Sequence, residues 1–171
     1  YQMRYLTGIV AGLQTKSNEI GYVAAFPIPE VNRGINAFTL GVRSVNPDAK
    51  VYVRWINSWT EDEAAANVAK NLISEHNIDV LAMHTDSLEP LRIADEYNIM
   101  SIGYNIDNSE LYPDSYLTAA VWDWEKFYTP HILKCLQGKF EGANYWESSD
   151  TGIMDIAPLS DKVNSETAEI I

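Results

Sequence analysis

Five short segments of this sequence combine side chains that could bind or convert a ligand. Each follows an apolar stretch typical of a β-strand, and three of the five pair a large aromatic ring with polar neighbours. Aromatic rings stack on flat molecules, and polar groups beside them hydrogen-bond to the molecule's edge. The composition therefore indicates a site for a planar ligand. The segments are Phe26–Glu30, Asn57–Trp59, His84–Ser87, Tyr104–Asp107 and Trp122–Trp124.

A catalytic triad is an alternative interpretation of one segment, because His84, Asp86 and Ser87 lie within four residues. Three residues at the end of one strand cannot all converge on one another. The G-x-S-x-G motif that exposes a nucleophilic serine is also absent. Nucleophilic catalysis is therefore the weaker interpretation.

Metal binding is a second alternative for the same segment. His84 and Asp86 could supply two ligands, but no third ligand has suitable spacing, because His76 and His131 fall on predicted helices. We therefore expect a hydrogen-bonded structural role for His84, and neither a metal nor a cofactor. Two motifs that cradle nucleotide phosphates, G-x-G-x-x-G and G-x-x-x-x-G-K-[ST], are absent.

The tryptophans differ in what their surroundings predict. Trp55 lies within an apolar strand, which favours core packing, whereas Trp59 follows a polar turn where packing does not call for an indole. We therefore expect Trp59 to contact the ligand. Trp122 and Trp124 share one face of a predicted strand, and Asp123 points to the other.

The overall composition narrows the class of partner. The chain has 171 residues, 24 Asp and Glu against 12 Lys and Arg, and a net charge of −12, which disfavours nucleic acid and anionic lipid. A hydrophobic share of 46% is typical of a globular protein with a core. The single cysteine, Cys135, excludes an intrachain disulfide, and its position in a predicted helix favours a buried, inert thiol.

Strands and helices that alternate along the chain must position these segments. Right-handed crossovers then produce an α/β fold whose parallel sheet is covered on both faces, with a ligand crevice beyond the carboxyl ends of the strands. We expect small strands and loops over 139–171. The predicted strands are 19–26, 51–57, 78–84, 98–105 and 115–124, and the predicted helices are 30–45, 60–73, 88–97 and 125–137.

The sequence makes specific predictions for the helix that begins near Thr60 and for the helix at the start of the chain. Thr60 and Glu63 have the spacing of a capping box, and the acidic run Glu61–Glu63 suits a solvated first turn. Residues 1–16 have apolar side chains at helical spacing and form a helix with nothing before it. We expect this first helix to be bare, because the part of a longer protein that packs on it is absent.

The ordered set of strand-end motifs resembles the basic membrane protein family, the solute-binding lipoproteins of purine-importing ABC transporters. The similarity extends over nearly the whole chain, and the ordered set is more specific than any single motif. The matching stretches are GYVAAFPIPEVNRGINAFTLGVRSVNP, VRWINSWTEDEAAANVAKNLI, DVLAMHTDS, IGYNIDN and LTAAVWDW.

This resemblance implies a type I periplasmic-binding-protein fold, in which two α/β lobes joined by hinge strands close on a ligand. Residues 1–18 would then belong to a missing N-terminal lobe, and 19–114 would form the C-terminal lobe. Residues 115–171 would contain the hinge crossing, a helix and terminal strands shared between the lobes.

The resemblance also implies which residues bind the ligand. Phe26 and Trp59 match the aromatic pair that holds a purine ring. Asn105 and Trp122 stand where nucleoside-binding members have ribose-binding Asp and Lys, which favours a free base such as adenine. Asp86 or Thr85 would face the ring edge. The expected ligand-binding residues are Phe26, Trp59, Thr85, Asp86, Tyr104, Asn105 and Trp122.

The resulting hypothesis is a non-enzymatic, extracytoplasmic protein that delivers an adenine-like base to an ABC transporter permease. Membrane association would come only from a lipid anchor outside this chain, and nucleic acid is not an expected partner. Three alternatives stay open: a ligand-sensing regulatory domain of the same fold, a nucleoside-binding transporter component, and an α/β enzyme acting on a nucleobase.

Overall fold

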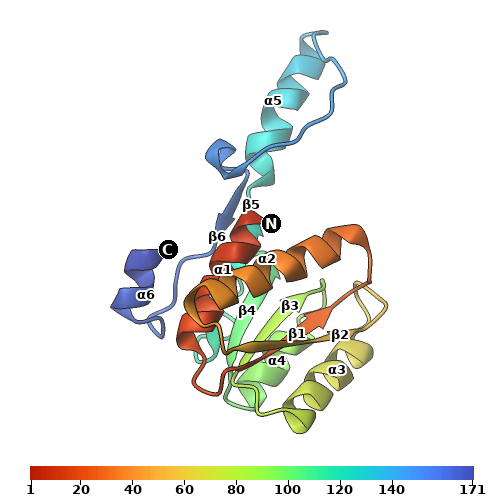
Figure 1. Cartoon of the computed structure of the whole chain (residues 1–171). Helices are drawn as coiled ribbons and strands as arrows, with labels where there is room; N and C mark the ends of the chain where they lie inside the picture. Colours follow the sequence, from red (N-terminus) through yellow and green to blue (C-terminus); the bar gives the residue numbers. More distant parts are fainter.

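A computed structural model describes residues 1–171 and contains one six-stranded sheet of order β2-β1-β3-β4-β5-β6 (Figure 1). The first five strands are parallel, as predicted, and the short β6 pairs antiparallel with β5. Parallel strands bring their carboxyl ends to one edge, so the five predicted segments meet there. The strands are β1 (Glu19–Ala24), β2 (Lys50–Trp55), β3 (Val80–His84), β4 (Met100–Asn105), β5 (Tyr116–Trp122) and β6 (Met154–Ile156).

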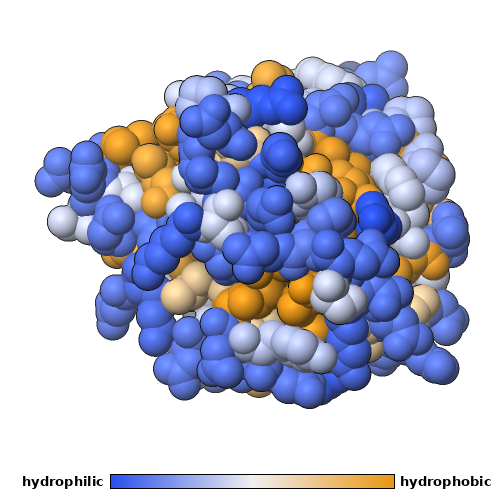
Figure 2. Space-filling view, turned by 60° about the horizontal axis from the view of Figure 1, so that its bottom comes forward, coloured by the Kyte–Doolittle hydropathy of each residue, from blue (hydrophilic) through white to orange (hydrophobic).

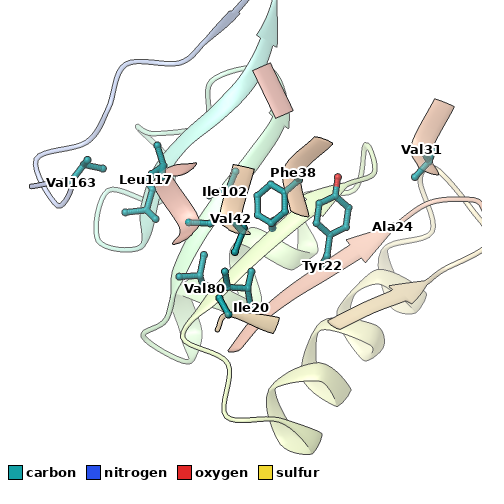
Figure 3. Close-up of a cluster of buried hydrophobic side chains, with 14 residues drawn as sticks. Ile20, Tyr22, Ala24, Val31, Phe38, Val42, Val80, Ile102, Leu117 and Val163 are labelled. Carbon is teal, nitrogen blue, oxygen red and sulfur yellow. The ribbon is translucent and has the colours of Figure 1, made fainter. Parts of the chain in front are cut away.

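Helices cover both faces of the sheet. Along β1, Ile20 and Tyr22 pack with one pair of helices, α1 and α2, while Val23 packs with α3 and α4 on the opposite face. Figure 3 shows Phe38 of α2 beside Tyr22, whose rings lie 5.2 Å apart. The helices are α1 (Gln2–Gln14), α2 (Pro29–Val45), α3 (Asp62–Glu75), α4 (Glu89–Glu96), α5 (Trp124–Leu136) and α6 (Ser165–Ile170).

The first helix is not bare, and that expectation was wrong. Eight residues of α1 are buried, and the helix packs closely on α2. Glycines make this approach possible: a Cβ on Gly8 would lie 2.1 Å from the Phe38 carbonyl oxygen, and one on Gly41 would lie 2.0 Å from that of Tyr5. α1 and α2 therefore pack against each other in backbone contact. The apolar spacing of α1 predicted a helix but not which element would cover it.

Residues 124–148, which we call the extension, project away from the sheet (Figure 1). α5 has no buried residue, although it presents large apolar side chains such as Ile132 and Leu136, which are 57% and 79% exposed. Cys135 is consequently exposed, and the expectation of a buried thiol was wrong because the returning chain covers only the side of α5 that carries Phe127 and His131. Elsewhere hydrophilic residues dominate the surface, with hydrophobic patches between them on the face in Figure 2.

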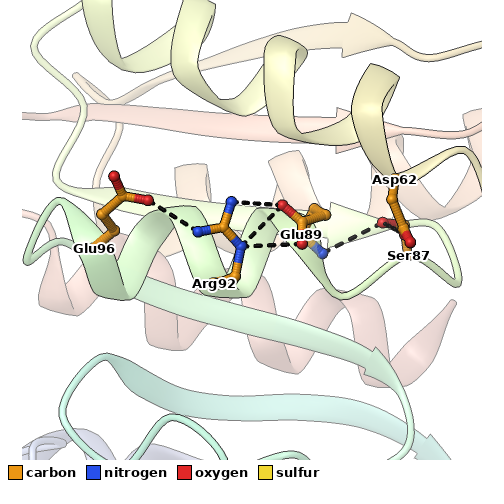
Figure 4. A network of polar contacts seen from close by, with 5 residues as sticks. All are labelled: Asp62, Ser87, Glu89, Arg92 and Glu96. Carbon is orange, nitrogen blue, oxygen red and sulfur yellow. Dashed lines mark hydrogen bonds and ion pairs between the residues drawn. The ribbon is translucent and has the colours of Figure 1, made fainter.

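The start of α3 also differs from the prediction. The helix begins at Asp62 with no side-chain cap, so the capping box of Thr60 and Glu63 does not form. Asp62 is not simply solvated, because it accepts a 2.6 Å hydrogen bond from Ser87 and so joins α3 to the start of α4. Figure 4 shows the adjoining ion pairs of Arg92 on α4, which reach Glu89 and Glu96. No helix combines the length and apolarity needed to span a bilayer.

Candidate functional site

Two adjoining hollows lie at the carboxyl ends of the strands. The inner hollow has a volume of about 460 Å³ and lies between the first turns of α1 and α2, the ends of β3 to β5, and the extension. The outer hollow has about 500 Å³ and is more open. Glu30, Tyr104 and Trp122 line both hollows, so the two form one continuous cleft.

Five of the seven predicted ligand-binding residues line this cleft. Tryptophan rings supply stacking surface, while a carboxylate and an amide supply hydrogen-bonding groups. The indoles of Trp122 and Trp124 are stacked with centroids 5.3 Å apart, although Trp124 begins α5 and does not extend the strand. The five residues are Trp59, Asp86, Tyr104, Asn105 and Trp122.

The other two predicted residues, Phe26 and Thr85, lie beside the cleft. The ring of Phe26 is 6.2 Å from that of Trp59, in a tilted arrangement. Thr85 is fully buried, and its hydroxyl donates a 2.6 Å hydrogen bond to the main-chain carbonyl of Trp59. Thr85 therefore positions the Trp59 loop in this structure.

His84 is buried as a structural histidine would be, but it also lines the inner hollow. Its Nδ1 lies 3.3 Å from the Tyr22 hydroxyl, and its Nε2 lies 3.2 Å from Oε1 of Glu30. Burial, together with the nearby Arg4 cation, lowers the pKa of His84 to about 4. The imidazole is therefore neutral at pH 7, and its proximity to Glu30 lowers the pKa of that carboxyl.

Arg4 is a buried charged residue of the site that the sequence did not reveal. It is 4% exposed, lines the inner hollow, and its guanidinium carbon lies 4.3 Å from the centroid of the Tyr104 ring. Burial in turn raises the pKa of the Tyr104 hydroxyl, which stays neutral. In the sequence, Arg4 is a lone arginine in an apolar helix. Only the packing of α1 beside the cleft shows that this arginine belongs to the site.

Further lining residues lie outside the five predicted segments. Arg33 follows Glu30 by three positions in α2, which is the spacing of one helical face. Tyr145 and Trp146 come from the extension, whose path has no periodic sequence signal. No three metal-ligating side chains lie together.

The fold and the cleft define a class: an open α/β sheet with a ligand site beyond its strand ends, as in one lobe of a periplasmic-binding-protein-like molecule. Residues 1–170 match the model of the Bmp family, described as ABC transporter substrate-binding protein PnrA-like. The chain belongs to this family, as the resemblance predicted.

Relatives and solved structures agree with this assignment. The chain is 40% identical over 169 residues to a putative ABC transporter glucose-binding protein of Haloferax volcanii, covering 99% of this chain and 43% of the relative. It is 36% identical over 160 residues to a purine-binding protein of Brucella abortus, covering 94% and 45%. The chain thus spans less than half the length of these relatives.

Solved structures share the fold at lower identity. A transcriptional activator of the comK gene from Bacillus halodurans has a TM-score of 0.89 at 24% identity, covering 99% of this chain and 59% of that one. An ABC transporter solute-binding protein from Aeropyrum pernix has a TM-score of 0.82 at 16% identity, covering 99% and 50%. The type I periplasmic-binding-protein fold is therefore confirmed.

Proposed function

We propose that this chain is one lobe of an extracytoplasmic solute-binding protein that captures a free purine base, of which adenine is the model, and presents it to an ABC transporter permease. The observation that carries this proposal is the outer hollow, where Trp59 and Trp122 flank Asp86 and Asn105. A planar ring can stack on the indoles while its edge hydrogen-bonds to the polar groups. Stacking contributes about 1–3 kcal/mol per base.

The extension supports a two-lobe arrangement. Large apolar side chains of the extension, such as Ile132 and Leu136, are exposed to solvent. The extension is joined to the sheet through β5 and through the segment that leads to β6. We propose that residues 115–171 contain the hinge crossing and that a second lobe packs on the extension. Because α1 is packed within the sheet's own core, residues 1–18 belong with 19–114 in this proposal. Closure of the lobes over the ligand would create the shape that a permease recognises.

Selectivity for a free base follows from two positions. A ribose would need hydrogen-bond partners for its hydroxyls, and Asn105 and Trp122 cannot supply the charge-assisted hydrogen bonds that an Asp and a Lys would form. The Trp122 indole also occupies volume at the cleft that a sugar would need. The family is described as substrate-binding, so the proposed role is binding without chemical conversion.

Competition titrations on the full-length protein test this proposal. We expect adenine to bind at least tenfold more tightly than adenosine, which corresponds to about 1.4 kcal/mol. Guanine, guanosine and glucose complete the panel, since one relative is named for glucose and another for purine. Tighter binding of a nucleoside would show that Asn105 and Trp122 do not select for a free base. Binding of glucose without any purine would overturn the proposal.

A further inference from the structure

The buried guanidinium of Arg4 is only half satisfied by the protein. Its Nη1 donates a 2.9 Å hydrogen bond to the Met83 carbonyl oxygen at the end of β3. Its Nη2 is buried and has no hydrogen-bond partner. The hydrogen bond to Met83 holds the Arg4 side chain between α1 and the sheet. A purely structural role therefore accounts for Nη1 but not for Nη2.

An unpaired cationic donor in this position is costly. Buried polar groups in native proteins are almost always hydrogen-bonded, because an unpaired one loses its contacts with water and gains nothing in return. No carboxylate lies within ion-pairing distance of Arg4. Oε1 of Glu30, the carboxylate that shares the inner hollow, lies 3.2 Å from Nε2 of His84. The Tyr104 ring under the guanidinium supplies a cation–π contact, which does not satisfy an N–H group.

The geometry of the cleft shows where a partner would come from. Arg4 lines the inner hollow together with Glu30 and Tyr104, the residues through which this hollow continues into the outer one. A ligand stacked in the outer hollow would therefore extend its edge toward Arg4. Arginine has donors and no acceptor, so the facing ligand atom must be an acceptor.

We propose that Arg4 is a ligand-binding residue whose Nη2 donates a hydrogen bond to an acceptor atom of the bound molecule. If the ligand is a purine base, as in the proposed function on which this detail rests, that acceptor is a ring nitrogen or a ring carbonyl oxygen. Glu30 lines the same hollow and supplies an acceptor for a neighbouring N–H of the ligand. Purine edges match this pair because they place acceptors next to N–H donors.

Two Arg4 variants of the full-length protein test the proposal. Arg4→Lys keeps a positive charge that can still reach Met83 but lacks the second nitrogen that Nη2 provides. Arg4→Gln removes the charge. Arg43→Gln, on the exposed last turn of α2, is the matched control. By calorimetric titration with adenine, we expect both Arg4 variants to bind at least tenfold more weakly than the wild type and the control to match it. A melting curve for each variant shows whether it is folded.

A ligand series separates direct contact from a general disturbance of the cleft. In 1-, 3- and 7-deazaadenine, one ring nitrogen acceptor is replaced by C–H. If Arg4 binds a ring nitrogen, one of these analogues binds the wild type at least tenfold more weakly than adenine, while Arg4→Lys no longer distinguishes the two. Parallel loss of affinity for all three analogues in the variant would assign Arg4 a structural role and overturn the proposal.

The outcomes also separate this inference from the proposed function. Unchanged adenine affinity in both Arg4 variants overturns the role of Arg4 and leaves purine binding intact. If the wild type binds glucose and no purine, the proposed function fails. In that case the same variants are titrated with glucose, whose hydroxyl oxygens are acceptors. Tenfold weaker glucose binding supports the role of Arg4, and unchanged binding overturns it.

Discussion

The hydroxyl of Thr85 donates a 2.6 Å hydrogen bond to the main-chain carbonyl of Trp59. The same carbonyl accepts hydrogen bonds from the main-chain N–H groups of Asp86 and Ser87, at 2.8 and 3.2 Å. The loop after β2 is thereby tied to the end of β3. Since Trp59 and Asp86 both line the outer hollow, one set of hydrogen bonds fixes a stacking surface and a polar group relative to each other.

Replacing Thr85 by Val should weaken ligand binding without unfolding the protein. The carbonyl of Trp59 keeps its two main-chain donors, so we expect a loss of about 1 kcal/mol in the free energy of unfolding. Looser positioning of the indole should lower purine affinity several-fold. Thr85→Ser, which keeps the hydroxyl, is the control for calorimetry and denaturant unfolding. Wild-type affinity in Thr85→Val would show that this hydrogen bond does not position the site.

Trp59→Ala should weaken adenine binding by tenfold or more, because it removes one stacking surface. Trp55→Ala should chiefly destabilise the fold, by less than the roughly 3–5 kcal/mol of a fully buried indole, because Trp55 is partly buried on the edge strand β2. Both indoles are partly buried against the same core cluster, so Trp59→Ala will also cost some stability. Titration and melting of both variants measure the two effects separately. Equal affinity in the wild type and Trp59→Ala would exclude Trp59 from the site.

Much of this architecture was predictable because local patterns determine it. The continuous apolar run of β3 and the alternation of strands and helices predicted the parallel sheet, and the sheet in turn brings Trp59, Tyr104 and Trp122 together. Strand-end position is a property of topology, so it needs no knowledge of side-chain packing.

The errors arose where long-range packing decides the outcome. Arg4 lies 79 residues from Met83, its hydrogen-bond partner, and nothing local identifies that contact. α1 is buried because Gly8 lets it approach the backbone of α2. Cys135 is exposed because α5 projects away from the sheet. A helical pattern predicts that one face is apolar, but it does not reveal which surface covers it.

Gly41→Ala should destabilise the protein although alanine is about 1 kcal/mol better than glycine within a helix. The new Cβ would lie 2.0 Å from the carbonyl oxygen of Tyr5, so α1 and α2 must separate. We expect a loss of roughly 1–3 kcal/mol, as for other overpacked cores. Asn36→Ala on the exposed side of α2 is the control, measured by denaturant unfolding. Unchanged or increased stability in Gly41→Ala would show that the two helices are not in backbone contact.

The stability of the protein should depend on pH through His84. Burial and the nearby Arg4 lower the pKa of His84 to about 4, against an ordinary value of 6.5. Tyr22, Glu30 and Tyr104 are its other titratable neighbours. Between these two pKa values the unfolded chain binds the proton more readily than the folded one, so stability falls as the pH decreases. The maximum loss is roughly 3 kcal/mol, since one pKa unit corresponds to about 1.4 kcal/mol.

His84→Gln isolates this contribution, because glutamine is similarly polar and does not titrate. Between pH 7.5 and pH 5, we expect wild-type stability to fall about 2 kcal/mol further than that of the variant, measured by denaturant unfolding. Glu30 acts in a separate range: its pKa is lowered, so its stabilisation is present above about 4.5 and is lost as the pH falls through its folded pKa. The comparison at pH 5 therefore reports mainly on His84. If wild type and variant lost stability in parallel, the imidazole would not be buried in its neutral form.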